Sequence, residues 1–163
     1  MPERAQPTPF EVIDTDPHVS RVVRYFRPSD YAVWGAATVA APAFLIGLDR
    51  VNSKSRVHSM GFPLRLATFI GAVGGFMLAY QRSSYRFWGW AENGAEVVKD
   101  KEEMRERIAQ GKPLYGESQL TPYLQEVSAR NSRYAATKFN AFPWFNFANH
   151  QSHGVDESKY QQQ

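Results

Sequence analysis

The sequence predicts an all-α membrane protein: a two-helix transmembrane hairpin, an extended N-terminal segment, and a mostly helical or irregular C-terminal extramembrane region. Two uncharged stretches carry this prediction, the 18 residues Tyr31 to Leu48 and the 16 residues Leu66 to Gln81. A third observation is that small residues recur at every fourth position in both stretches. A membrane-crossing helix needs about 17 to 25 residues. The first stretch meets this length, and the second meets it when Phe62 to Leu64 join it and Arg65 snorkels to the headgroups.

Residues 1–29 form a predicted N-terminal arm, extended at first and then briefly helical. Prolines at positions 2, 7 and 9 favour irregular backbone, and a segment of this kind is more suited to lying along a partner than to folding alone. Asp16 and Pro17 are typical of an N-cap and a first helical position, so we expect a short helix to begin there. It should end near Phe26, because Pro28 disfavours helical backbone at the residue before it.

The hairpin is predicted within residues 30–81, with helices at about 31–48 and 63–81 and a basic connector at 49–62. Ser29 or Asp30 would cap the first helix, and Pro42 should kink it. At helical spacing the small residues fall on one side of each helix, where a second backbone can approach closely. The predicted helix-packing interface consists of Ala67, Gly71, Gly75 and Ala79 on the second helix and Ala32, Ala36 and Ala40 on the first.

The net charge of +3 is concentrated around the connector. Asp49 is the one acidic residue between positions 49 and 65, and the rest of the chain holds equal numbers of basic and acidic residues. Positive side chains beside a bilayer fit phospholipid headgroups, including cardiolipin, or an acidic protein surface. The candidate headgroup contacts are Arg50, Lys54, Arg56 and Arg65. No basic stripe interleaved with aromatic residues supports nucleic-acid binding.

Residues 82–163 form the predicted extramembrane C-terminal region, with helices near 95–110 and 121–138. Gly111 is typical of the residue after a helix, and Thr121 followed by Pro122 is typical of a helix start. The aromatic residues that follow are more than a soluble monomer leaves exposed, so they should dock into a partner or a membrane interface, with partner docking favoured. These residues are Phe139, Phe142, Trp144, Phe145 and Phe147. The tail from Gln151 onward is polar, and we expect its end to be mobile.

A search for reactive groups gives no catalytic, cofactor-binding or metal site and no small-molecule substrate. The chain has no cysteine, which excludes thiolate metal sites and cysteine nucleophiles. His150 and His153 share a spacing but have no third ligand nearby in the sequence, so they are interpreted as incidental. Asp14 and Asp16 are interpreted as solvated charges. Neither apolar stretch carries an ionisable residue at its centre, which disfavours an ion pathway.

A soluble helical protein with two buried apolar helices is the alternative to the hairpin. It requires other amphipathic helices to cover those two, and the remainder of the chain offers too few. A hairpin in a lipid bilayer therefore accounts better for the two stretches.

The order of segments resembles a known family. The residues that carry the resemblance are P-S-D-Y at 28–31, Y-Q-R-S-S-Y-R-F-W-G at 80–89 and K-P-L-Y-G-E at 112–117, with an Ala-rich and a Gly-rich span between the first two. This arrangement resembles the fungal 21 kDa-type accessory subunit of mitochondrial respiratory complex I, the NADH:ubiquinone oxidoreductase. It is more distantly similar to a two-helix accessory subunit of the animal complex.

The resemblance implies a non-catalytic subunit of the membrane arm that stabilises and helps to assemble the proton-pumping complex. Its partners would be other complex I subunits, and its location the mitochondrial inner membrane, crossed twice. The charge of the connector favours the matrix for that loop and the intermembrane space for both termini. The alternative is a two-span mitochondrial adaptor or assembly factor that binds a respiratory complex only transiently.

Overall fold

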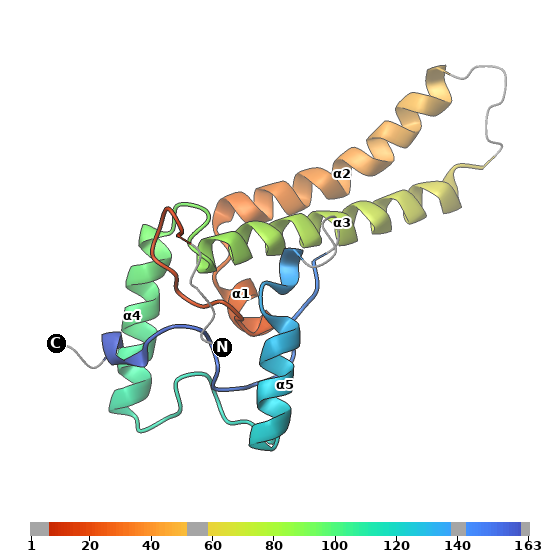
Figure 1. The fold of residues 1–163 in the computed structure, drawn as a ribbon. Coiled ribbons are helices and arrows are strands. Elements are labelled where there is room, and N and C mark those ends of the chain that lie inside the picture. Colours follow the sequence, from red (N-terminus) through yellow and green to blue (C-terminus); the bar gives the residue numbers. More distant parts are fainter. Residues whose placement is uncertain (1–6, 52–58, 138–142, 161–163) are drawn as a thin grey trace. The chain divides into compact units, whose positions relative to one another are not determined.

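The computed structural model describes residues 7–51, 59–137 and 143–160, and all regular structure in these ranges is helical (Figure 1). The α-helices in these ranges are α1 (Val19–Arg24), α2 (Pro28–Val51), α3 (Gly61–Phe87), α4 (Gly94–Ala109) and α5 (Pro122–Ser132). Two short 3₁₀ turns, Ala135–Thr137 and Glu157–Tyr160, come later. The all-α prediction is therefore confirmed for the part of the chain that the structure describes.

The chain divides into two compact units, and the division falls inside α3. Residues 26–81, which we call the hairpin unit, contain α2 and most of α3. The residues before position 26 join those after position 81 in the second unit, which we call the terminal unit. The sequence prediction treats the two ends of the chain as separate regions, whereas the structure packs them together. The two ends pack together because buried aspartates near the N-terminus pair with buried histidines near the C-terminus.

Two helices begin with recognisable capping signals. In α2, Pro28 occupies the first position, where its missing N–H costs no hydrogen bond, and Asp30 Oδ2 accepts a hydrogen bond from the backbone N–H of Arg27 at 2.8 Å. In α5, the side chain of Thr121 accepts a hydrogen bond from the backbone N–H of Leu124, as its sequence predicts.

The start of α1 is not where the sequence predicts it. The N-cap residue is His18, whose Nδ1 accepts a hydrogen bond from the backbone N–H of Ser20 at 3.2 Å. The prediction that Asp16 caps this helix is wrong, because that carboxylate is buried and paired with residues from the other end of the chain.

The N-terminal segment runs along the end of α3 within the terminal unit. The backbone N–H of Ile13 donates to the carbonyl of Phe87 at 2.9 Å, and that of Phe10 donates to the carbonyl of Gly89 at 3.1 Å. Gly89 has a φ of +69°, and a side chain there would collide with the backbone of Phe10. Asn93 Nδ2 joins the two segments by donating to the carbonyls of Glu11 and Arg86, each at 2.7 Å. The segment is thus fixed by backbone hydrogen bonds.

Close contact between α2 and α3 depends on two glycines of α3. A Cβ atom added to Gly71 would lie 2.6 Å from the carbonyl oxygen of Ala37, and one added to Gly75 would lie 2.8 Å from that of Trp34. The indole Nε1 of Trp34 donates to the carbonyl of Ala72 at 2.8 Å. The two backbones therefore approach closely only because side chains are missing at these positions.

The residues of α2 at this contact differ from the predicted alanine stripe. Atoms of Trp34, Ala37, Thr38 and Ala41 are the ones that approach the two glycines. The predicted stripe of Ala32, Ala36 and Ala40 is exposed in the chain. It is offset around the helix from the contacting residues, since four-residue spacing alone does not fix which side of a helix faces its neighbour. A contact between this stripe and another protein stays a prediction.

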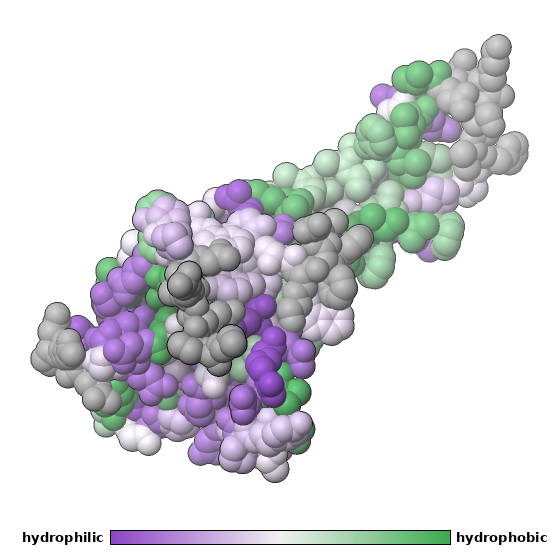
Figure 2. All heavy atoms as spheres, in the orientation of Figure 1, coloured by the Kyte–Doolittle hydropathy of each residue, from purple (hydrophilic) through white to green (hydrophobic). Residues whose placement is uncertain are grey.

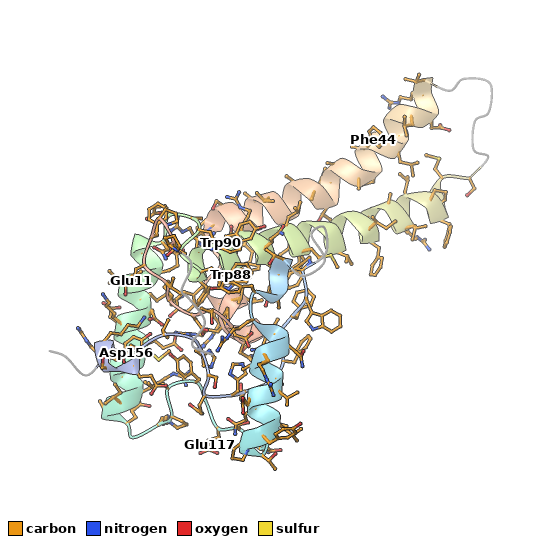
Figure 3. The ribbon with its side chains drawn as sticks, in the orientation of Figure 1. Glu11, Phe44, Trp88, Trp90, Glu117 and Asp156 are labelled. Carbon is orange, nitrogen blue, oxygen red and sulfur yellow. The ribbon has the colours of Figure 1, made fainter. Side chains whose placement is uncertain are left out.

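Both hairpin helices are long and apolar enough to cross a membrane by length and composition. The apolar windows of α2 and α3 have mean hydropathies of 1.6 and 1.5, and 0% and 17% of their residues are buried in the chain. Large apolar side chains such as Phe44, which is 70% exposed, project outward from these helices (Figure 3). Figure 2 shows apolar residues gathered along the hairpin. A helix buried in a soluble core would instead show most of this surface covered.

We expect Gly71→Leu or Gly75→Leu to destabilise the hairpin by about 1–3 kcal/mol, because the new side chain must displace the backbone of α2. The measurement is the thermal unfolding midpoint of the full chain in detergent micelles. Gly74→Leu is the matched control, since no described atom lies within 4 Å of a Cβ added there. Phe69→Leu is a second control, because Phe69 is 66% exposed. Equal midpoints for all four variants would show that the glycine contacts do not hold the helices together.

Candidate functional site

The terminal unit buries a cluster of ionisable side chains drawn from distant parts of the chain. We call this set the polar cluster, and each member is at most 6% exposed. Its members come from the N-terminal segment, α1, α4 and the C-terminal segment: Asp14, Asp16, Arg21, Asp100, His150 and His153. Charged groups are costly to remove from water unless each is paired. The contacts within the cluster show how this cost is offset.

Arg21 lies at the centre of the cluster and bridges two carboxylates. Its Nη1 lies 2.9 Å from Asp14 Oδ2, and its Nη2 pairs with Asp100 Oδ1. The hydroxyl of Tyr160 donates to the other oxygen of Asp100 at 2.7 Å. One guanidinium thus connects the N-terminal segment, α1 and α4, and Tyr160 adds the C-terminal segment.

His153 forms a second pair with Asp14. Its Nδ1 lies 2.8 Å from Asp14 Oδ1. Burial would raise the pKa of Asp14, but the attraction and hydrogen bond of His153, together with the charge of Arg21, hold that pKa below its ordinary value. Asp14 therefore stays ionised inside the unit.

His150 pairs with Asp16 beside the first pair. His150 Nε2 lies 2.7 Å from Asp16 Oδ2, and the hydroxyl of Ser132 donates to the same oxygen. Asn146 Nδ2 donates to the backbone carbonyl of Asp16 at 3.1 Å. The residues that were interpreted as a solvated acid and an incidental histidine therefore form one buried contact.

A serine, a histidine and an aspartate meet here, but not in the order that nucleophilic catalysis needs. A catalytic serine must be hydrogen-bonded to a histidine that removes its proton, with the carboxylate behind that histidine. In this structure the carboxylate of Asp16 lies between Ser132 and His150, and all three side chains are buried. The arrangement gives Asp16 Oδ2 two hydrogen-bond partners and does not activate the hydroxyl. Among the described residues, no group of three or more histidine, cysteine or acidic side chains could hold a metal ion.

The interpretation of these acids and histidines as solvated or incidental is wrong. Asp14 and Asp16 are buried, and so are His150 and His153 in the segment expected to be a polar tail. Each acid lies more than 130 positions from the histidine that it contacts, so neither the spacing of the two acids nor that of the two histidines reveals the pairing. The one sequence signal is that both ends of the chain carry a closely spaced pair of complementary ionisable residues.

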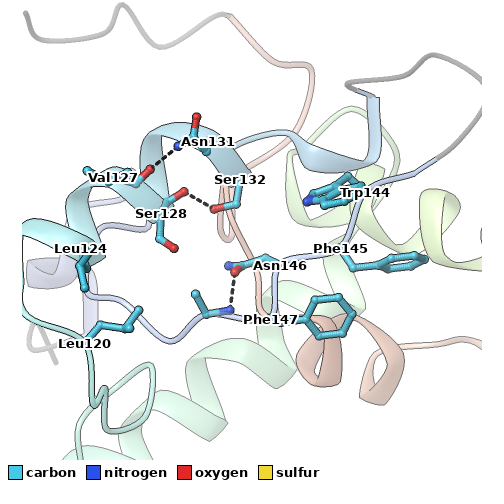
Figure 4. Close-up of a pocket in the computed structure, with 11 residues that line it drawn as sticks. Leu120, Leu124, Val127, Ser128, Asn131, Ser132, Trp144, Phe145, Asn146 and Phe147 are labelled. Carbon is cyan, nitrogen blue, oxygen red and sulfur yellow. Dashed lines mark hydrogen bonds between the residues drawn. The ribbon is translucent and has the colours of Figure 1, made fainter.

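A groove of about 470 Å³ lies in the terminal unit, between α5 and residues 144–148 (Figure 4). Leu120, Leu124 and Val127 line it from α5 and the residues before it. Trp144, Phe145 and Phe147 line it from the other segment. Trp144 is 56% exposed and Phe147 is 72% exposed. The predicted docking residues Phe139 and Phe142 lie outside the described residues.

The predicted headgroup contacts are only partly described. Arg50 is exposed in the last turn of α2, and Arg65 is exposed near the start of α3. Lys54 and Arg56 lie outside the described residues. The two described arginines therefore belong to the connector ends of the hairpin helices.

Comparison with known proteins gives matches along almost the whole chain. A family model described as "NADH-ubiquinone oxidoreductase complex I, 21 kDa subunit" matches residues 7–92. A second, described as "C-terminal of NADH-ubiquinone oxidoreductase 21 kDa subunit", matches residues 101–163. A curated relative, the NADH-ubiquinone oxidoreductase 20.9 kDa subunit of Neurospora crassa, is 48% identical over 158 residues, which is 96% of this chain and 83% of that protein.

We expect Arg21→Met to destabilise the protein by about 3–5 kcal/mol, because it leaves buried carboxylates without their shared cation. The measurement is the urea midpoint of the full chain in detergent micelles, followed by far-ultraviolet circular dichroism. Arg24→Met is the matched control on the same helix: Arg24 is 55% exposed and pairs with Glu103 at 3.1 Å, so its loss should cost less than about 1 kcal/mol. Similar midpoints for the two variants would contradict a central role for Arg21.

Proposed function

The chain belongs to the family of the 21 kDa subunit of NADH-ubiquinone oxidoreductase complex I, and we propose that it is a non-catalytic accessory subunit of the membrane arm of that complex. Membership implies a mitochondrial location and other complex I subunits as partners. The observation that carries the proposal is that the two family models together match both the hairpin unit and the terminal unit.

In this proposal α2 and α3 cross the mitochondrial inner membrane as an antiparallel hairpin. The helices have 24 and 27 residues, which at about 1.5 Å per residue exceeds the hydrocarbon thickness of about 30 Å. Exposed apolar side chains along both helices support a lipid or protein-bundle environment. The glycine contacts at Gly71 and Gly75 would let the pair form a thin, rigid element that fits against a larger helix bundle.

The terminal unit supports a topology in which both ends of the chain lie on one side of the membrane. Residues on either side of the hairpin pack into the same unit, so a bilayer cannot separate them. We place this unit in the intermembrane space and the basic connector in the matrix, on the charge of the connector. Arg50 and Arg65, with Lys54 and Arg56, would then meet phospholipid headgroups there, and a doubly anionic lipid such as cardiolipin suits such bases.

The pairing of ionisable groups within the terminal unit supports a structural role. The carboxylates and imidazoles of the polar cluster are buried and paired with one another, so they stabilise the fold. Within the proposed complex, the unit would brace neighbouring subunits and support their assembly. The groove between α5 and residues 144–148 is the surface that we propose for docking a neighbouring subunit, because it exposes aromatic side chains.

We expect the protein to resist alkaline carbonate extraction of mitochondria and to comigrate with NADH dehydrogenase activity on native gels of solubilised membranes. The first result follows from an integral hairpin and the second from stable incorporation into complex I. Release into the carbonate supernatant would contradict the hairpin. Retention in membranes without comigration would instead favour a transiently bound adaptor or assembly factor.

We expect Trp144→Ser combined with Phe147→Ser to lower the amount of this protein that copurifies with complex I by about tenfold, since aromatic anchors at interfaces are typically worth 2 kcal/mol or more. The measurement is quantitative mass spectrometry of the complex purified through another subunit. Tyr123→Ser is the matched control, because Tyr123 is 70% exposed on α5 but does not line the groove. Equal incorporation of both variants would exclude the groove as a docking surface.

A further inference from the structure

The two histidines of the C-terminal segment have different hydrogen-bond partners. In His153, Nδ1 faces a carboxylate oxygen of Asp14 and Nε2 faces the backbone carbonyl of His150, each at 2.8 Å. Both partners are acceptors. Only the imidazolium carries a proton on each ring nitrogen, so only this form satisfies both contacts.

His150 has one acceptor, Asp16 Oδ2, and two donors, the backbone N–H of Ser152 and Asn146 Nδ2 at 3.4 Å, as partners. Its Nε2 faces Asp16 Oδ2 at 2.7 Å, whereas its Nδ1 accepts a hydrogen bond from the backbone N–H of Ser152 at 3.2 Å. The neutral ring with its proton on Nε2 satisfies the contacts with Asp16 and Ser152. The two histidines, although three positions apart, therefore have different hydrogen-bond patterns.

Several elements contribute titratable or charged groups around His153. Asp14 comes from the N-terminal segment, Arg21 from α1, and His150 from the same segment as His153. The ring of Tyr115, from the loop after α4, stacks on His153 with centroids 3.6 Å apart. Burial and the nearby Arg21 lower the pKa of His153, but the charge and hydrogen bond of Asp14 outweigh them and raise it above its ordinary value.

We propose that His153 is a pH-sensitive clasp that holds the C-terminal segment against the N-terminal segment while it carries a proton and loosens the C-terminal segment when it loses that proton. When the ring is neutral, one ring nitrogen presents a lone pair to an oxygen 2.8 Å away, and the charge pair with Asp14 is lost. The hydrogen bonds from Thr15 to the carbonyl of His153 remain, so the change loosens the segment without detaching it.

The direction of the pH effect follows from the raised pKa. A group with a higher pKa in the folded state stabilises the fold fully below its unfolded-state pKa, which is about 6.5 for histidine. That contribution disappears as the pH rises through the folded-state value. The clasp therefore holds below about pH 6.5 and weakens as the pH rises through the raised folded-state pKa of His153.

Hydrogen–deuterium exchange of the full chain in detergent micelles tests the proposal. We expect amides of residues 151–160 to exchange roughly tenfold faster at pH 9 than at pH 6, after correction for intrinsic rates. Amides of α4 are the internal reference and should change little. Equal protection of the C-terminal segment at both pH values would overturn the proposal.

Substitution of each histidine tests which of the two causes the pH dependence. His153→Gln should exchange quickly in this segment at both pH values, because the titrating ring is gone, whereas His150→Gln should keep the pH dependence. The proposal that His153 is the titrating group would be overturned if His153→Gln kept the pH dependence of exchange, or if only His150→Gln lost it. If His153→Gln loses its helical circular dichroism, titration of ¹³C-labelled histidine in the unmodified chain decides: a His153 pKa at or below about 6.5 overturns the clasp. The outcome does not depend on membership of a respiratory complex.

Discussion

The terminal unit depends on the bridge that Arg21 makes between Asp14 and Asp100. This guanidinium is almost fully buried, and its two carboxylate partners belong to segments that precede α1 and follow α3. The unit also has an apolar core, which includes Ile13, Phe87 and Met104, but apolar contacts do not select one partner for each charged group. Ionic pairing thus specifies how the ends of the chain meet. Buried charge pairs contribute more to this specificity than to the free energy of folding.

Sequence reasoning succeeds where the structure is determined locally. The two long helices follow from uninterrupted apolar stretches, α4 from a charged segment closed by Gly111, and the start of α5 from Thr121 and Pro122. It fails where partners are distant. Nothing near Asp16 in the sequence indicates that His150 pairs with it, and so the sequence predicts a helix cap at this aspartate. Likewise, small-residue spacing identifies Gly71 and Gly75 but not the residues of α2 that they meet.

The two units have complementary physical characters that suit an accessory subunit. The hairpin exposes apolar side chains and needs an apolar environment, whereas the terminal unit has its own buried cluster and needs none. The chain thus combines an apolar hairpin unit with a separately packed terminal unit.

The hydrogen bonds between the N-terminal segment and the distal parts of the chain also constrain biosynthesis. Asp16 and His150 are 134 positions apart, so Asp16 cannot meet its native partner until the segment that carries His150 has been synthesised. Contacts of such long sequence separation form late and slowly. The polar cluster therefore forms only once the segment that carries His150 and His153 is available.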